Sequence, residues 1–351
     1  MDGAPFKVGC HSKCGAHYFH NLGNVLTKRA IGEEAYMCLR SHCNSGRNPH
    51  HLYLLDLVCL TEGFSYIILA RTSGFLLPAQ TRLSGFFCSC ETWYTVGMKK
   101  KIIVANWKMY PKTPGDAKKL FTAIKKEVAP LQKVAVCVCP PFVFLPELAK
   151  LGVTRKVSLG VQDVAHEEVG AYTGQVSPLM VSAYKAKTTI VGHSERRALG
   201  ESNAVVAEKV KHAVRAGMHI LVCVGEQERS DEGDYYTFIR EQLEAVLRVV
   251  KKADMKHLSI AYEPVWAIGK SAEEALAPEA LYETVLFIRK VVTERFGRVT
   301  GEDVAVLYGG SVKVENAKEF VQVGDVDGLL VGSASLDPKQ FASICKTIIE
   351  Q

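Results

Sequence analysis

The chain has 351 residues, 48% of them hydrophobic, and a formal net charge of +6, which allows a large hydrophobic core in one or two domains. The charge is small for this length and is not gathered into long Lys/Arg runs, so neither nucleic acid nor an anionic membrane is the implied partner. No apolar run approaches the roughly 18 residues of a membrane-spanning helix, so no membrane span is expected, whereas a small anionic substrate is compatible with the composition.

The first 97 residues show no sustained helical or strand periodicity and do not read as a folded domain. A zinc site at Cys10, Cys14, His17 and His20 is an alternative, but the spacing lacks the dozen intervening residues that separate the ligand pairs of a zinc finger. The first residues match neither an amphipathic presequence nor a secretory signal, so no targeting peptide is expected. We therefore expect two parts: residues 1–97, an unassigned extension that is a misassigned start or a disordered appendage, and a catalytic domain from Met98 to Gln351.

From Met98 onward, short apolar runs alternate with amphipathic stretches, which is typical of a parallel sheet covered by helices. The predicted strands are residues 102–105, 134–139, 157–161, 188–191, 219–224, 258–262, 305–308 and 328–331. The predicted helices are residues 117–127, 145–151, 178–183, 203–216, 238–251, 278–296, 314–321 and 338–349. Eight strand-helix pairs in about 250 residues favour a closed α/β barrel over an open doubly wound sheet.

Three of the four cysteines after residue 98 fall inside predicted strands: Cys137, Cys139 and Cys223. A thiol in such a run behaves as a small hydrophobic side chain in a reducing compartment. We interpret these three residues as part of the core.

In a barrel of this kind, the chemistry gathers where strands end and loops begin. Glu263 lies at such a point, between the strand at 258–262 and a glycine-bearing loop that resembles a lid with two hinges. Other polar residues at strand ends include Lys108, which offers a point charge, and His193, which offers an acid or electrophile. Each has a simpler interpretation by itself: a surface carboxylate, a solvated lysine and a hydrogen-bonded core histidine.

Glycines and serines follow the seventh and eighth predicted strands, at Gly309, Gly310, Ser311, Gly332 and Ser333. Backbone N–H groups at such positions can approach a phosphate, and a short helix beginning there adds a favourable dipole. The interpretation as ordinary turns is the alternative. The set as a whole predicts a phosphorylated substrate.

Five motifs, in the same order, resemble the signatures of the triosephosphate isomerase family. They are residues 106–108 (NWK), 191–197 (VGHSERR), 261–269 (AYEPVWAIG), 308–311 (YGGS) and 327–332 (DGLLVG). The resemblance runs from Met98 to Gln351 and leaves residues 1–97 outside it. It implies a (β/α)8 TIM barrel that interconverts dihydroxyacetone phosphate and D-glyceraldehyde 3-phosphate, with no metal or organic cofactor, in a cytoplasmic homodimer.

The resemblance also implies a role for each site residue. Glu263 would be the base, and His193 a neutral imidazole that polarises the carbonyl group. Lys108 would stabilise the enediolate, Asn106 would donate to a substrate oxygen, and Glu195 would orient this cluster. The phosphate would rest on backbone N–H groups of Gly269, Ser311, Gly332 and Ser333.

The sequence departs from the family pattern at four places. Gly269 meets Lys270 directly, which shortens the lid tip by two residues and predicts that Ser311 loses a contact to the tip. Gln175 stands where a glutamate is usual, after the loop whose Thr173 inserts into the partner subunit, and Ser333 replaces a glycine. The N-terminal extension, residues 1–97, is the fourth departure. The resemblance implies a dimer through the loop from Gln162 to Gln175.

A second hypothesis is a catalytically silent phosphate-binding barrel that serves as a scaffold. Such a protein would be expected to lose at least one of Glu263, His193, Lys108 and Asn106, and all four are present. The isomerase is therefore the favoured hypothesis.

Overall fold

The computed structural model describes residues 55–56, 69–70, 101–229, 233–271 and 274–349. The chain divides into two units, Met1–Thr92 and Trp93–Gln351. In the first unit, the described part is an antiparallel pair, β1 (Leu55–Asp56) and β2 (Leu69–Ala70). The zinc hypothesis and the predicted boundary at Met98 both lie outside the described residues.

In the second unit, eight parallel strands close into a barrel, as the sequence predicts. The barrel closes where β10 pairs with β3, with Gly328 opposite Ile102. A Cβ atom on Gly328 would lie 1.8 Å from the carbonyl oxygen of Ile102, so only glycine fits this closure. The strands are β3 (Lys101–Asn106), β4 (Val134–Cys139), β5 (Val157–Val161), β6 (Thr188–Val191), β7 (His219–Val224), β8 (Leu258–Tyr262), β9 (Ala305–Tyr308) and β10 (Gly328–Val331).

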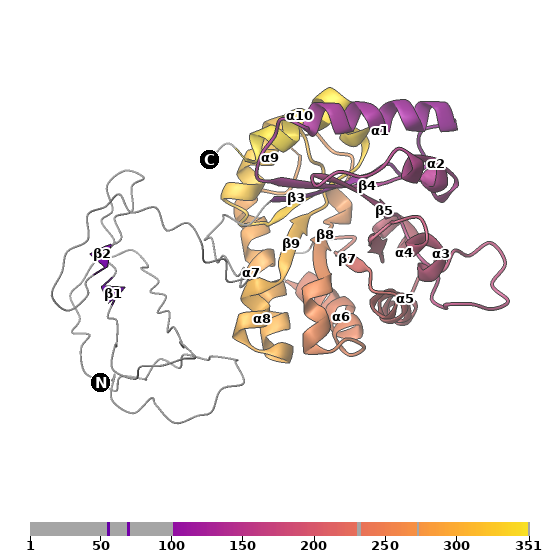
Figure 1. Cartoon of the computed structure of the whole chain (residues 1–351). Helices are drawn as coiled ribbons and strands as arrows, with labels where there is room; N and C mark the ends of the chain where they lie inside the picture. Colours follow the sequence, from indigo (N-terminus) through magenta and orange to yellow (C-terminus); the bar gives the residue numbers. More distant parts are fainter. Residues whose placement is uncertain (1–54, 57–68, 71–100, 230–232, 272–273, 350–351) are drawn as a thin grey trace, which may run out of the picture. The chain divides into compact units, whose positions relative to one another are not determined.

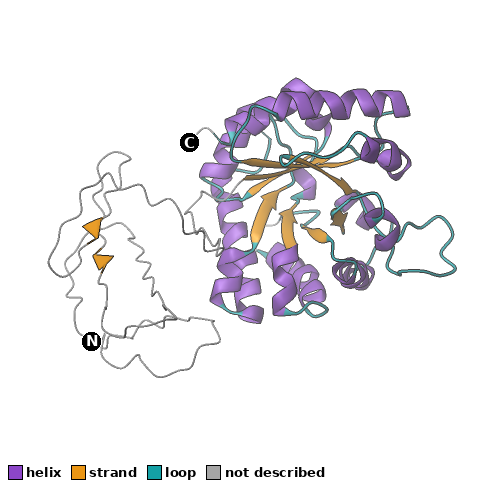
Figure 2. Ribbon diagram, viewed as in Figure 1, coloured by secondary structure: helices purple, strands orange, loops and turns teal. Residues whose placement is uncertain are grey.

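Helices surround the barrel, and Figures 1 and 2 show the strands in the centre with the helices outside them. The α-helices are α1 (Pro114–Val128), α2 (Leu145–Lys150), α3 (Pro178–Ser182), α4 (Ser194–Ala198), α5 (Asn203–Arg215), α6 (Asp234–Leu247), α7 (Pro278–Phe296), α8 (Arg298–Asp303), α9 (Val314–Gln322) and α10 (Pro338–Thr347). The short 3₁₀ helices are η1 (Phe142–Phe144), η2 (Lys252–His257), η3 (Val265–Ala267) and η4 (Ser333–Leu336). The sequence did not predict α4 and α8. None of the described helices is long and apolar enough to cross a membrane.

Several helices begin at a residue that the sequence makes a good N-terminal cap. Before α1, the Thr113 hydroxyl accepts a hydrogen bond from the Asp116 N–H, and Pro114 takes the first helical position. Before α5, Ser202 accepts from the Val205 N–H in the same way. These caps determine the residue at which each helix begins, and therefore where the preceding loop ends.

Alternate strand residues face opposite sides, so the barrel has two layers of core. Residues that face outward pack against the helices in one large cluster, which includes Ile103, Val136 and Ile260. Residues that face inward fill the barrel: Val104, Cys137, Cys139, Ile190, Leu221, Cys223, Ala261, Leu307 and Leu330. The three predicted core cysteines are therefore free, buried thiols inside the barrel. A filled interior leaves only the ends of the barrel for a site.

Candidate active site

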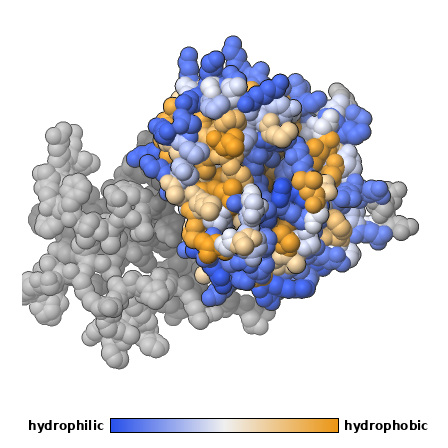
Figure 3. Space-filling view, turned by 90° about the vertical axis from the view of Figure 1, so that its right-hand side faces the viewer, coloured by the Kyte–Doolittle hydropathy of each residue, from blue (hydrophilic) through white to orange (hydrophobic). Residues whose placement is uncertain are grey.

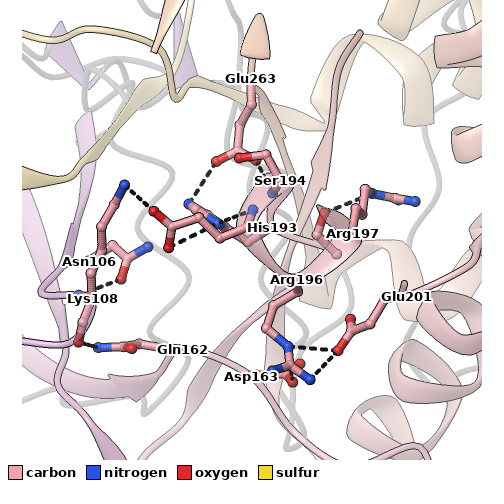
Figure 4. A network of polar contacts seen from close by, with 12 residues as sticks. Asn106, Lys108, Gln162, Asp163, His193, Ser194, Arg196, Arg197, Glu201 and Glu263 are labelled. Atoms are coloured by element: carbon pink, nitrogen blue, oxygen red, sulfur yellow. Dashed lines mark hydrogen bonds and ion pairs between the residues drawn. The ribbon is translucent and has the colours of Figure 1, made fainter. Parts of the chain in front are cut away.

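The predicted catalytic residues lie at the C-terminal ends of three strands. Asn106 is the last residue of β3, Glu263 directly follows β8, and His193 lies two residues after β6. Because all strands are parallel, these ends meet at one mouth of the barrel. Asn106, His193 and Glu263 are all buried. Figure 4 shows the side chains of Asn106, Lys108, His193 and Glu263 turned toward one another.

The two oxygens of Glu263 have different surroundings. Oε2 accepts a hydrogen bond from the backbone N–H of Ser194 at 3.0 Å. Oε1 is buried, accepts no hydrogen bond from any described residue, and lies 3.2 Å from Nε2 of His193. Gly309 packs against the side chain of Glu263. A Cβ atom on Gly309 would lie only 2.9 Å from Cγ of Glu263, so the close packing requires a glycine. One oxygen is thus held in place, and the other is free to accept a proton.

The protonation state of His193 follows from its hydrogen bond to the backbone. Nδ1 accepts a hydrogen bond from the N–H of Glu195 at 3.1 Å, at the start of α4. A nitrogen that accepts from an N–H carries no proton, so this hydrogen bond favours the neutral ring with its proton on Nε2. The Nε2–H group therefore faces the mouth of the barrel, next to Glu263.

Lys108 is the cation of the cluster. Its Nζ lies 2.6 Å from Oε1 of Glu195, and its own backbone N–H donates to Oδ1 of Asn106. The backbone of Lys108 has φ of 52°, which is costly for a residue with a side chain. Nε2 of Gln162 holds this conformation by donating to the carbonyl oxygens of both Lys108 and Cys139. The charge is therefore fixed in position by its neighbours.

The predicted phosphate loops lie around Lys108 and the lid. A Cβ on Gly332 would be 3.4 Å from Cε of Lys108, which places the loop after β10 next to the ammonium group. The backbone N–H groups of Gly269, Ser311 and Gly332 donate no hydrogen bond to another described residue. Ser333 begins η4 and is exposed, and its side chain forms no hydrogen bond with another described residue. These N–H groups are available for an anion.

The lid contacts the barrel at two points. At its start, Nε1 of Trp266 donates to Oε1 of Glu226, which also accepts from the hydroxyl of Tyr262. At its tip, the hydroxyl of Ser311 donates to the carbonyl oxygen of Lys270 at 2.6 Å. The shortened tip has no second glycine to contact Ser311, as the sequence predicts, but the carbonyl group of Lys270 makes a different contact with the same hydroxyl.

Sequence reasoning assigned no role to Arg197, which holds the turn before α4. Its Nε donates to the carbonyl oxygen of Gly192 at 2.8 Å, and its Nη1 donates to Oδ1 of Asn203. Burial lowers the pKa of Arg197, while the nearby Cys223 and Glu263 act in the opposite direction. A five-residue helix is too short for a periodic signal, so no pattern in the sequence points to this contact of Arg197.

No group of three or more His, Cys, Asp or Glu side chains suited to a metal ion occurs among the described residues. The cluster instead combines a carboxylate with one free oxygen, a neutral imidazole N–H, an ammonium group and free backbone N–H groups. Such a set can move a proton next to a carbonyl group while it holds an anionic substrate.

Comparisons with known proteins agree with this chemistry. A model of the family described as "Triosephosphate isomerase" matches residues 101–348. The triosephosphate isomerase of Thermoanaerobacter sp. (strain X514) is 41% identical over 249 residues, which cover 70% of this chain and 99% of the relative. That of Thermus thermophilus is 40% identical over 253 residues (71% and 99%), and that of Idiomarina loihiensis is 37% identical over 247 residues (70% and 96%).

Proposed function

The chain belongs to the triosephosphate isomerase family, and we propose that Glu263, His193, Lys108 and Asn106 carry out its reaction. That reaction is the interconversion of dihydroxyacetone phosphate and D-glyceraldehyde 3-phosphate through an enediolate. The observation that supports these roles best is the buried Oε1 of Glu263, which accepts no hydrogen bond from any described residue and lies beside the imidazole of His193.

In the proposed mechanism, Glu263 removes the proton from the carbon next to the carbonyl group and returns it to the neighbouring carbon. Its Oε1 has lone pairs to accept that proton, while the Ser194 N–H keeps the other oxygen in place. A fixed carboxylate is needed because a displacement of about 1 Å can cost about 100-fold in rate. The strand end and the start of α4 supply this fixation.

His193 and Lys108 stabilise the negative charge that develops on the substrate oxygens. The neutral His193 donates from Nε2 to the carbonyl oxygen and moves protons between the hydroxyl groups, a role already described for this family. The Lys108 ammonium group lies close enough to Gly332 to serve both the enediolate and the phosphate. The side-chain N–H₂ group of Asn106 has no partner among the described residues, so it can donate to a substrate oxygen.

The phosphate binds the free N–H groups of Gly269, Ser311 and Gly332, and Ser333 adds its own at the start of η4. Gly269 is in the lid, so phosphate binding and lid closure occur together. Closure excludes water, which matters because an exposed enediolate would lose its phosphate. No metal or organic cofactor takes part in these steps.

The protein works as a homodimer in this proposal, with the loop from Gln162 to Gln175 as the main contact. This loop extends away from the barrel between β5 and α3, and Thr173 at its tip is exposed. Exposed hydrophobic side chains nearby are those of Met109, Val143 and Val169. Figure 3, which faces the side from which the loop extends, shows hydrophobic patches between hydrophilic ones. A partner subunit would cover such patches.

We place the protein in the cytoplasm, where glycolysis and gluconeogenesis use this reaction. The free thiols of Cys137, Cys139, Cys223 and Cys345 support a reducing compartment. No feature of the described residues favours the scaffold hypothesis. The proposed extension of residues 1–97 carries none of the proposed site residues.

A coupled assay that follows triose phosphate turnover in both directions tests the proposal. The full chain should be active in the presence of a metal chelator, and Glu263→Gln should lose activity while it still binds an inert phosphate analogue. As a matched control, Glu241→Gln removes one exposed carboxylate of α6 and should leave activity unchanged. Binding of the analogue by a wild-type chain without turnover would support the scaffold instead.

A further inference from the structure

A cavity of about 710 Å³ lies next to the first turn of the lid and is separate from the catalytic cluster. Its volume is within the range of small-molecule sites, roughly 300 to 1,000 Å³. It is lined by Glu228, Arg229, Gly233, Tyr235, Tyr236, Trp266 and Glu283, from the segment after β7, the start of α6, the lid and α7. Apart from the lid, none of these elements takes part in the proposed reaction.

Aromatic rings form much of the cavity wall. The rings of Tyr235 and Tyr236 lie 4.2 Å apart between centroids, and the indole of Trp266 adds a third surface. The guanidinium carbon of Arg229 lies 4.3 Å from the centre of the Tyr235 ring, and its Nη2 donates to the hydroxyl of the same residue at 2.7 Å. The wall therefore already holds one cation through its ring face and hydroxyl group.

The cavity also contains two carboxylates, Glu228 before α6 and Glu283 on α7. Both are exposed, and neither forms an ion pair with any described residue. Arg229 is the one cationic residue among the described residues that line the cavity. Its Nη2 donates to Tyr235, whereas its buried Nη1 has no hydrogen-bond partner among the described residues. The lining therefore carries an excess of negative charge, although the whole chain is positive, at +6.

We propose that this cavity binds an organic ammonium ion, an aliphatic diamine or polyamine. Its ammonium groups would meet Glu228 and Glu283, and its methylene chain would lie along Tyr236 and Trp266. An anion would face two carboxylates and only one guanidinium. A bare metal ion is disfavoured because no group of three metal ligands occurs among the described residues.

Binding there is coupled to the lid through Trp266. The indole forms one wall of the cavity, and its Nε1 donates to Glu226 beside β8. An amine packed against the indole holds the first turn of the lid on the barrel, and a lid that opens more slowly releases product more slowly. This coupling to turnover rests on the proposed function, whereas binding itself does not.

The test is calorimetric titration of the full-length protein with spermidine. We expect one site, and Glu228→Gln and Glu283→Gln should each weaken binding, with the double variant roughly tenfold weaker. Tyr236→Leu should also weaken it, because the ring face is lost, whereas Glu241→Gln outside the cavity should not. Equal affinity in the double variant, or equal displacement by Mg²⁺ at matched ionic strength, would overturn the proposal.

The coupling has its own measurement. Saturating spermidine should lower kcat and KM together in the wild type and in Glu241→Gln, and should have no effect in the Glu228→Gln and Glu283→Gln double variant. Unchanged kcat and KM at saturation would overturn the coupling. If the chain proved inactive, the titration would still decide whether the cavity binds the amine.

Discussion

The backbone N–H of Ser194 donates to Oε2 of Glu263 at 3.0 Å, across 69 positions of sequence. This bond holds the carboxylate from the start of α4, while Oε1 lies beside Nε2 of His193 and accepts no hydrogen bond from any described residue. The proposed catalytic base is thus positioned by a helix that follows a different strand. Its position, as well as its charge, should determine the rate.

Glu263→Asp should therefore be far slower than the wild type. The change keeps the negative charge but withdraws the oxygens by about 1 Å, which can cost about 100-fold, while Glu263→Gln removes the base and should cost roughly 10² to 10⁴. KM should change much less, because in the proposed site backbone groups elsewhere hold the phosphate. Steady-state kinetics of both variants measures this. An active Glu263→Gln would mean that another residue is the base.

Ser311→Ala should lower kcat/KM. The hydroxyl donates to the carbonyl oxygen of Lys270 at the lid tip, and a neutral hydrogen bond contributes about 0.5 to 1.5 kcal/mol. The loss should therefore be about two- to tenfold, measured with the wild type as reference and Ser343→Ala on α10 as a control. An unchanged kcat/KM would show that the contact does not contribute to closure.

Gln175→Glu tests the proposed dimer. By the family pattern, a glutamate here pairs with Arg196 across the interface, and its restoration should tighten dimerisation. In the structure, however, Nε of Arg196 lies 3.2 Å from Asp163, and its Nη2 lies 2.6 Å from Glu201. Because Arg196 already has two carboxylate partners, we expect a gain of no more than about 1 kcal/mol.

Analytical ultracentrifugation of the wild type and of Gln175→Glu gives the two dimer dissociation constants. Gln162 contacts the backbone of Lys108 and Cys139, so it is not a suitable control. Gln340 on α10 is exposed, so Gln340→Glu is a suitable control. If the dimer dissociation constant of Gln175→Glu were more than tenfold lower, the ion pairs of Arg196 with Asp163 and Glu201 would not compete with a pair across the interface.

A chain that begins at Met98 should be folded and as active per site as the full chain. All eight barrel strands lie between Lys101 and Val331, and every proposed site residue follows Met98. Circular dichroism and kcat of the two chains can be compared directly. Loss of solubility or of activity in the shorter chain would assign a role to the first 97 residues.

His219 predicts a pH dependence of stability. Burial lowers the pKa of His219 from its ordinary value of 6.5, with a smaller contribution from His257. The unfolded chain therefore binds this proton at a higher pH than the folded chain does, so the free energy of unfolding falls as the pH drops below 6.5. His219→Gln, which can still bond Ser259, should show a weaker fall of Tm between about pH 7 and pH 5. If Tm fell equally with pH in His219→Gln and in the wild type, His219 would not be the residue that causes the pH dependence.

The sequence by itself determined the barrel. Strands buried on both faces are continuous apolar runs, so seven of the eight have the predicted bounds, and only β3 (Lys101–Asn106) is longer by one residue at each end. Glu263, His193 and Lys108 could be recognised because each stands at a strand end inside a specific motif.

Only the tertiary structure decided how these residues are held. The bond from Ser194 to Glu263 and the contact of Ser311 with Lys270 both join segments whose pairing leaves no local pattern. Helix α4 has five residues, too few for a periodic signal, although it supplies the N–H groups that position both Glu263 and His193. Such contacts depend on distances in space, which appear only when the barrel closes and brings the strand ends together.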